Sequence, residues 1–231
     1  MEEKKYPLPA LGCHAPAFKA LTTNGEIEFP KDYAGKWVIL FSHPADFTPV
    51  CTTEVATFAA MQEEFKALNT ELVGLSVDSN SSHLAWLNTI EEKIRYRKYV
   101  GQKINFPLIA DAKGEIAALY GMIAPNMQET KACRTVFFID PKGMIRAMIY
   151  YPLSTGRNFE EIKRVIEALQ VTDKYGVSTP ADWQKGDDIL LSAPADKEAL
   201  IKRLADKDET KVCDDWFFCR QKLENVTKPK A

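Results

Sequence analysis

Hydrophobic residues along the chain fall into short runs separated by polar turns, a pattern typical of strands that alternate with helices. The run at 37–41 (Trp-Val-Ile-Leu-Phe) follows Gly35 and predicts a fully buried strand. Thr48 is a suitable N-cap and Pro49 a suitable first helical residue, so we expect a helix to begin there. Apolar residues then recur at helical spacing over about five turns, at Val55, Phe58, Phe65 and Leu68.

The rest of the first 170 residues continues this alternation. Further strands are predicted at 72–78, 106–110, 135–140 and 144–151, the last two joined as a hairpin by a Pro-Lys-Gly turn. Further helices are predicted at 83–94, 113–120 and 158–169. Strands and helices in this order predict an α/β fold of the thioredoxin-like kind, in which helices cover both faces of a mixed central sheet.

From residue 171 onward the composition is looser, with one predicted helix at 197–204. We therefore predict a thioredoxin-like domain over 1–170 and a C-terminal extension over 171–231. Near the end, Trp216, Phe217 and Phe218 follow one another in a polar tail. Such a cluster exposes much apolar surface unless it docks, either on this chain or on a second subunit.

Composition and charge exclude several classes of function. The chain has 231 residues, 45% of them hydrophobic, and a formal net charge of −2, which gives no general attraction to nucleic acid or an anionic membrane. Residues 1–7 contain no apolar signal segment, and no apolar run is long enough to span a bilayer, so we expect a cytoplasmic protein. The cysteines are sparse and odd in number, which does not fit a secreted disulfide framework: Cys13, Cys51, Cys133, Cys213 and Cys219.

Cys51 occupies the most promising position of the five. If Thr48 caps the helix, Cys51 is its third residue, where free N–H groups and the helix dipole favour an anion such as a thiolate. Pro44, at the end of the preceding strand, supplies a rigid wall without an N–H. The alternative on these local arguments is a cysteine that only packs at a strand-to-helix junction.

The segment around Cys51 also carries a longer motif. Pro44, Thr48 and Cys51 form a Pro-x-x-x-Thr-x-x-Cys pattern within the string HPADFTPVCTTE at 43–54, which resembles the active-site signature of peroxiredoxins. Stretches at 11–18, at Arg134 and at 150–158 support the resemblance, which extends over nearly the whole chain. The chain is most similar to the long branch that includes the one-cysteine members and their archaeal-type two-cysteine relatives. The resemblance implies a thiol peroxidase that needs no metal and no cofactor.

The resemblance also implies roles for individual residues. Cys51 attacks a hydroperoxide and becomes a sulfenic acid, while Arg134, the Thr48 hydroxyl and the Cys51 backbone N–H stabilise the charge that moves onto the oxygens. Arg157 supports Arg134, and Glu54 orients both arginines. By themselves these residues could equally be surface charges, and Glu54 a solvated helix residue. His43 could bond the sulfur or its oxidised forms, or be a satisfied structural histidine.

Cys213 and Cys219 are the candidate resolving thiols because they lie in the aromatic tail. Their spacing also permits a disulfide between them. The resemblance implies that Cys219 attacks Cys51 of a partner subunit, with Cys213 as the alternate partner of Cys219, in a homodimer that assembles into a ring, a homodecamer. A dithiol such as thioredoxin then recycles the enzyme. The alternative is that both tail cysteines are incidental; Cys13 and Cys133 we interpret as structural.

Two other functions compete with peroxide reduction. A redox-switched chaperone or peroxide sensor stays open, as an additional activity or as the main one. A disulfide reductase is disfavoured because the sequence has no Cys-x-x-Cys motif. A metal site is not expected, since no close set of Cys and His residues has ligand spacing.

Overall fold

The structure is a computed structural model that describes residues 8–123 and 131–226, so segment 1–7, where we expected no signal segment, lies outside the described residues. The chain divides after Phe159 into two compact units, which are described separately below. None of the described helices is long and apolar enough to cross a bilayer.

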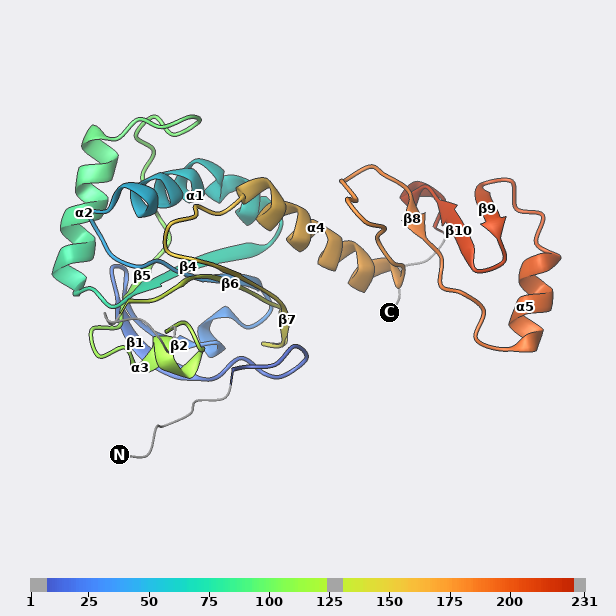
Figure 1. Cartoon of the computed structure of the whole chain (residues 1–231), viewed down its shortest axis with the longest axis horizontal. Coiled ribbons are helices and arrows are strands. Elements are labelled where there is room, and N and C mark those ends of the chain that lie inside the picture. Colours follow the sequence, from blue (N-terminus) through green and yellow to red (C-terminus); the bar gives the residue numbers. More distant parts are fainter. Residues whose placement is uncertain (1–7, 124–130, 227–231) are drawn as a thin grey trace. The chain divides into compact units, whose positions relative to one another are not determined.

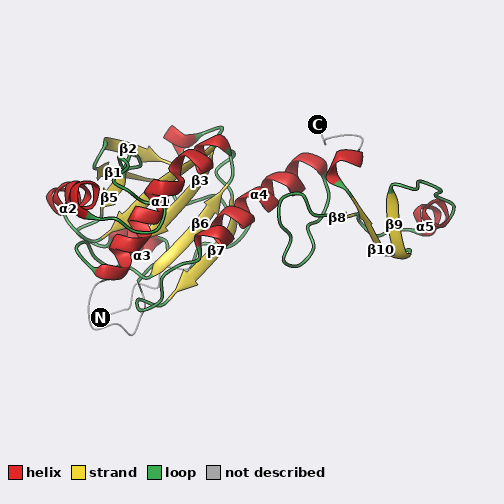
Figure 2. Cartoon of the chain, turned by 90° about the horizontal axis from the view of Figure 1, so that it is seen from above, coloured by secondary structure: helices red, strands yellow, loops and turns green. Residues whose placement is uncertain are grey.

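The N-terminal unit is built on a seven-stranded mixed sheet with strand order β2-β1-β5-β4-β3-β6-β7. Its central strands β3, β4 and β5 are parallel to one another, whereas the strands toward both edges pair antiparallel. The strands are β1 (Phe18–Thr22), β2 (Gly25–Phe29), β3 (Trp37–Ser42), β4 (Thr70–Ser76), β5 (Leu108–Ala110), β6 (Arg134–Ile139) and β7 (Ile145–Tyr151). Figure 2 shows these strands side by side, with α1 lying across them. The predicted mixed sheet is therefore observed.

Strand β3 is buried along its whole length because both faces of the sheet are covered. Val38 and Leu40 belong to the apolar cluster that includes Phe137 of β6. Phe41, the next residue along the strand, stacks on Phe58 of the first long helix, with ring centroids 4.2 Å apart. Because successive side chains point to opposite faces, this one strand contributes to two cores.

Three α-helices and one short 3₁₀ helix accompany this sheet. They are η1 (Lys31–Tyr33), α1 (Pro49–Ala67), α2 (Asn80–Lys93) and α3 (Glu115–Leu119). Helices α1 and α2 lie on one side of the sheet and α3 on the other (Figure 1). Helix α1 begins as predicted, with Thr48 as N-cap and Pro49 first. Helix α2 begins earlier than predicted, because Ser79 caps it by accepting a hydrogen bond from Ser82 N.

The C-terminal unit contains a second, small sheet. Helix α4 (Phe159–Tyr175) is followed by β8 (Ile189–Leu190), α5 (Lys197–Leu204), β9 (Lys211–Asp215), β10 (Phe218–Gln221) and η2 (Leu223–Asn225). The three strands pair antiparallel in the order β8-β10-β9. Helix α4 runs through residue 170, and the domain boundary there stays a prediction. Trp216, Phe217 and Phe218 are 40%, 53% and 41% exposed in the single chain.

Candidate active site

Cys51 lies in the first turn of α1, directly after the loop that follows β3. Its side chain is completely buried. The first backbone bond of the regular helical pattern here runs from Thr52 N to Thr48 O, at 2.9 Å, so the Cys51 N–H precedes that pattern. The sulfur thus belongs to a helix N-terminus, where the dipole favours negative charge.

Thr48 is the N-cap in extended conformation, but its hydroxyl does not cap the helix. It donates instead to the carbonyl of Ala45, at 2.9 Å, and makes no side-chain capping bond. Because a hydroxyl has only one hydrogen, Thr48 presents its remaining lone pairs as acceptors. The expected donor role of this hydroxyl therefore requires it to rotate away from Ala45.

Arg134, the first residue of β6, reaches both the thiol and a carboxylate. Its Nη1 donates to Cys51 Sγ at 3.3 Å and to Glu54 Oε2 at 2.7 Å, and its Nε donates to the Leu153 carbonyl at 2.8 Å. The guanidinium is nearly fully buried. A positively charged donor at this distance stabilises negative charge on the sulfur.

Arg157 completes a buried charge cluster around Glu54. Its Nη2 and Nε donate to the two Glu54 oxygens at 2.7 and 3.0 Å, and its backbone N–H donates to Oε1 at 2.9 Å. Its Nη1 donates to the carbonyls of Ser42 and Thr135, which ties it to β3 and β6. The predicted grouping of Arg134, Arg157 and Glu54 is thus present in the structure.

The charges of this cluster do not balance within it. Burial raises the pKa of Glu54, but the charge and hydrogen bonds of Arg157 and the charge of Arg134 outweigh it and hold that pKa below its usual value. Glu54 is therefore ionised, and two guanidinium groups face one carboxylate. Buried charge is costly unless it is compensated. The remaining positive charge lies beside Cys51 Sγ, where a thiolate would neutralise it.

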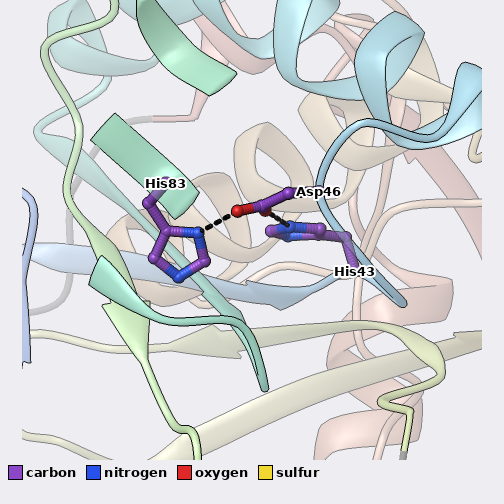
Figure 3. A group of neighbouring side chains, drawn as sticks. All are labelled: His43, Asp46 and His83. Atoms are coloured by element: carbon purple, nitrogen blue, oxygen red, sulfur yellow. Dashed lines mark hydrogen bonds and ion pairs between the residues drawn. The ribbon is translucent and has the colours of Figure 1, made fainter. Parts of the chain in front are cut away.

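A second buried cluster joins His43, Asp46 and His83 (Figure 3). His43 Nε2 lies 2.9 Å from Asp46 Oδ1, and His83 Nδ1 lies 2.8 Å from Asp46 Oδ2. The other ring nitrogen of His83 lies 3.1 Å from the Ile109 carbonyl, whereas His43 Nδ1 is buried and has no partner among the described residues. His43 was a sequence candidate, but Asp46 and His83 were missed.

The atoms of this trio lie close enough to hold a metal ion, a set that sequence spacing did not reveal. His43 and Asp46 are three residues apart, but His83 comes from α2, 37 positions beyond Asp46. Each facing atom is already used in a hydrogen bond within the trio. The arrangement is therefore a hydrogen-bonded chain rather than an open set of ligands.

Comparisons with known proteins decide the family. A model described as the AhpC/TSA family matches residues 11–148, and one described as the C-terminal domain of 1-Cys peroxiredoxin matches residues 168–207. A protein named peroxiredoxin from Methanosarcina mazei is 55% identical over 215 residues, which cover 93% of this chain and 98% of the relative. The chain belongs to the peroxiredoxins.

Further relatives extend the match over almost the full length of this peroxiredoxin. A peroxiredoxin from Aquifex aeolicus is 50% identical and covers 94% of the chain and 98% of its own length. A structure of yeast mitochondrial 1-Cys peroxiredoxin superposes with a TM-score of 0.79 at 39% identity, covering 93% of this chain and 100% of that one. A mutant of the Peroxiredoxin 6 of Arenicola marina gives 0.80 at 34% identity, covering 96% and 99%. The predicted thioredoxin-like fold and peroxidase class are confirmed.

The two tail cysteines of this peroxiredoxin face each other across the β9–β10 hairpin. Cys213 and Cys219 are cross-strand neighbours and form a disulfide. The two remaining thiols outside the Cys51 site lie in the N-terminal unit: Cys13 is exposed and Cys133 is partly buried. The carbonyl of Cys133 accepts a hydrogen bond from Ser42 Oγ at 2.6 Å, and a structural role for the thiols of Cys13 and Cys133 stays a prediction.

Proposed function

We propose that Cys51 is the thiol that this peroxiredoxin uses to reduce hydrogen peroxide and organic hydroperoxides. The thiolate attacks one peroxide oxygen, so that an S–O bond forms as the O–O bond breaks. Cys51 becomes a sulfenic acid, and the departing oxygen leaves as water or an alcohol after taking up a proton. The observation that carries this proposal is the contact of Arg134 Nη1 with the fully buried Sγ of Cys51, at 3.3 Å, in the first turn of a helix.

The surrounding groups suit the charge that develops along the breaking O–O bond. Arg134 is a fixed cation beside the sulfur, held in place by Leu153 and Glu54, and needs no reorganisation as charge moves onto oxygen. The Cys51 backbone N–H is a second donor. Thr48, as placed, accepts the hydroperoxide O–H through its lone pairs and can donate only after releasing Ala45. Pro44 closes this side of the site without adding an N–H.

His43 supports the oxidised form of Cys51 in this proposal. Burial lowers the pKa of His43 below its usual value, although the hydrogen bond to Asp46 opposes that shift. The ring is therefore neutral, and its Nδ1 is an acceptor without a partner among the described groups. Such an acceptor can take a hydrogen bond from the sulfenic acid O–H.

For the second half of the cycle, we assign Cys219 as the resolving thiol and Cys213 as its alternate partner. Cys219 of a second subunit attacks the Cys51 sulfenic acid and releases water, and Cys213 then attacks the mixed disulfide and frees Cys51. A dithiol such as thioredoxin would reduce the resulting Cys213–Cys219 bond, which is the bond the hairpin contains. For the yeast mitochondrial 1-Cys relative, the reported resolving mechanism runs via glutathione/thioredoxin systems.

The assembly expected for this cycle is a homodimer that forms a ring of ten subunits in the cytoplasm. Its support is the exposed aromatic cluster at 216–218, which a neighbouring subunit would bury. The second candidate function is a redox-switched chaperone or peroxide sensor, because the same exposed aromatic cluster lies next to the disulfide. Protection of an unfolding client protein that depends on peroxide treatment would favour that candidate.

One experiment tests both halves of the cycle. Wild type, Cys51→Ser, Cys213→Ser and Cys219→Ser are treated with one equivalent of hydrogen peroxide, and products are followed by peroxide consumption, non-reducing gels and mass mapping. Cys51→Ser should consume no peroxide, and Cys219→Ser should form no Cys51-linked dimer. Full turnover by Cys51→Ser would sink the peroxidatic assignment. A normal Cys51-linked dimer in Cys219→Ser would sink the resolving assignment alone.

A further inference from the structure

His83 lies outside the groups that touch Cys51, yet it is completely buried and bonded at both ring nitrogens. Nδ1 faces a carboxylate oxygen of Asp46 at 2.8 Å, and Nε2 faces the Ile109 carbonyl at 3.1 Å. Burying a histidine side chain costs free energy unless its polar atoms are hydrogen-bonded or its charge is paired. The peroxide chemistry described above does not use it.

The identity of the acceptors restricts where the protons are. A backbone carbonyl only accepts, so His83 Nε2 must carry a hydrogen. The second nitrogen then either donates to an Asp46 carboxylate, which makes His83 an imidazolium, or accepts from an Asp46 carboxylic acid. Burial raises the pKa of Asp46, but the hydrogen bonds from His43 and His83 outweigh it and hold that pKa well below its usual value. The carboxylate is therefore the form present.

We propose that His83 is a buried imidazolium that acts as a positioning residue, fixing through the Asp46 carboxylate the tautomer of His43 in which Nε2 carries the proton and Nδ1 is a bare acceptor. This inference rests on the proposed role of His43 toward oxidised Cys51 and adds what controls it. Asp46 accepts from both rings, at 2.9 Å from His43 and 2.8 Å from His83. A neutral His43 has one hydrogen, and the bond to Asp46 places it on Nε2.

The surroundings keep this arrangement rigid. The backbone N–H of Asp46 donates to Asp78 Oδ2 at 3.0 Å, which fixes the carboxylate-bearing loop to the end of β4. The ring of Trp86, one turn along α2 from His83, lies 5.1 Å from the His43 ring. Because Pro44 has no N–H, the residue after His43 cannot donate to Nδ1. The lone pair of Nδ1 therefore stays available.

A direct test is ¹⁵N NMR of the histidine side chains in the reduced full-length protein at neutral pH. The chemical shifts of ring nitrogens distinguish N–H from bare nitrogen. We expect His83 to show two protonated nitrogens, and His43 to show a protonated Nε2 with a bare Nδ1. A single protonated nitrogen on His83, or a proton on His43 Nδ1, overturns the proposal whatever the activity of the protein.

Two variants test the consequence. Asp46→Asn keeps the shape but can present an amide N–H to His43 Nε2, which moves the His43 proton to Nδ1. His83→Asn keeps a neutral N–H in the place of Nδ1 but removes the charge. We expect Asp46→Asn to reverse the His43 ¹⁵N signature and to shorten the lifetime of the Cys51 sulfenic acid by about 2–10-fold, the effect of losing one hydrogen bond to the sulfenic acid O–H. His14→Asn, at an exposed histidine, is the matched control and should match wild type.

The His43→Ala background separates positioning from folding. If Asp46 and His83 act through the His43 ring, adding Asp46→Asn to His43→Ala should cause no further loss, because the ring it orients is gone. If Asp46→Asn has the same effect in the His43→Ala background as in the wild type, the proposal is overturned. The failure of this inference can be told apart from the failure of the proposed function. If Cys51→Ser stays active, the peroxidatic assignment is wrong. If Cys51→Ser is inactive but His83 is neutral, only the present inference is rejected.

Discussion

The buried charge cluster makes a quantitative prediction for Glu54→Gln. Glu54 accepts three hydrogen bonds from Arg157 and one from Arg134, all between 2.7 and 3.0 Å. Glutamine keeps one acceptor oxygen but turns an N–H₂ group toward the guanidinium donors, and it removes the only carboxylate that these interactions place between the two arginines. Removing one partner of a buried ion pair typically costs about 3–5 kcal/mol. The variant should therefore be strongly destabilised.

Calorimetric melting measures this loss. At about 2–4 °C per kcal/mol for a chain of this size, the expected decrease in Tm is about 6–20 °C. Glu63→Gln is the matched control, because Glu63 lies on the same helix, α1, but is exposed. A surface change of this kind should alter stability by less than about 0.5 kcal/mol. A Glu54→Gln melt equal to that of the control would refute the charge-balance argument for Cys51.

The same variant has a predicted pH dependence. The pKa of Glu54 in the folded protein is below its usual value of 4.5, so the unfolded chain binds the extra proton more readily. Its contribution to stability is complete above that usual value and is lost as the pH falls through the lowered folded pKa. The difference in Tm between wild type and Glu54→Gln should accordingly become smaller at acidic pH. A gap that widens as the pH falls would contradict the sign of this shift.

Three further changes give independent tests. Arg134→Lys keeps the positive charge but loses the planar guanidinium that contacts the Cys51 thiol and the Glu54 carboxylate together. The oxidation of Cys51 by peroxide, followed by stopped flow, should therefore slow by about 10²–10³-fold. An unchanged rate would remove Arg134 from the mechanism. Gly74→Ala places a Cβ against Leu108 in β5 and should lower the free energy of unfolding by about 1–3 kcal/mol in urea titrations, whereas Gly156→Ala meets only ordinary contacts and should cost much less. Phe217→Ser should shift the protein to smaller species in light scattering if a neighbour buries that ring, and an unchanged mass would argue against this surface as an interface.

Local signals predicted the junction that carries Cys51, because each of its features depends on neighbouring residues. A buried strand, an N-cap and a proline at the first helical position lie within 20 residues of one another, and α1 begins where they indicate. Helix α4 shows how such reading falls short. It was expected to end at 169 but continues to Tyr175, where Gly176, with φ of +65°, terminates it.

One local signal was overlooked. Strands β1 and β2 form a hairpin whose pairing runs from Phe18–Phe29 to Thr22–Gly25. Asn24-Gly25 at its turn is among the strongest hairpin signals in a sequence, and Gly25 has φ of +105°. The short, half-exposed strands on either side lack the long apolar run that identified β3. The turn, rather than the strands, therefore carries the sequence signal for this hairpin.

Contacts between distant positions cannot be derived from local sequence patterns. Arg157 and Glu54 are 103 positions apart, and His83 and Asp46 are 37 apart. Nothing in the local pattern of α2 indicates that His83 faces the loop before α1, because its direction is set by how the helix packs on the sheet. The resemblance to a family implied the Arg157–Glu54 pair. No comparable motif implied the His83–Asp46 pair, which is apparent only in the three-dimensional structure.

The burial of Cys51 limits how the proposed cycle could resolve it. A disulfide requires the two Cβ atoms to approach within about 4.5 Å, and a completely buried Cys51 offers no room for a second cysteine. In the proposed cycle, the first turn of α1 would therefore have to unwind before a tail cysteine could attack. Trp86 Nε1, which donates to Thr52 Oγ1 at 3.2 Å, opposes this unwinding with the energy of about one hydrogen bond, roughly 1 kcal/mol.

Phe47 acts in the opposite direction. Its backbone has φ of +54°, in the left-handed region, and its ring is 58% exposed, so little packing compensates the strain. Such a conformation costs of order 1–3 kcal/mol in a residue other than glycine, and a rearrangement that releases the Phe47 backbone would recover that energy. Opening must also break the backbone bond from Thr52 N to Thr48 O and the Arg134–Sγ contact. Of these two, the Arg134 contact involves the sulfur itself, so in the proposed cycle oxidation of Cys51 would change it directly and couple exposure of the residue to the peroxide step.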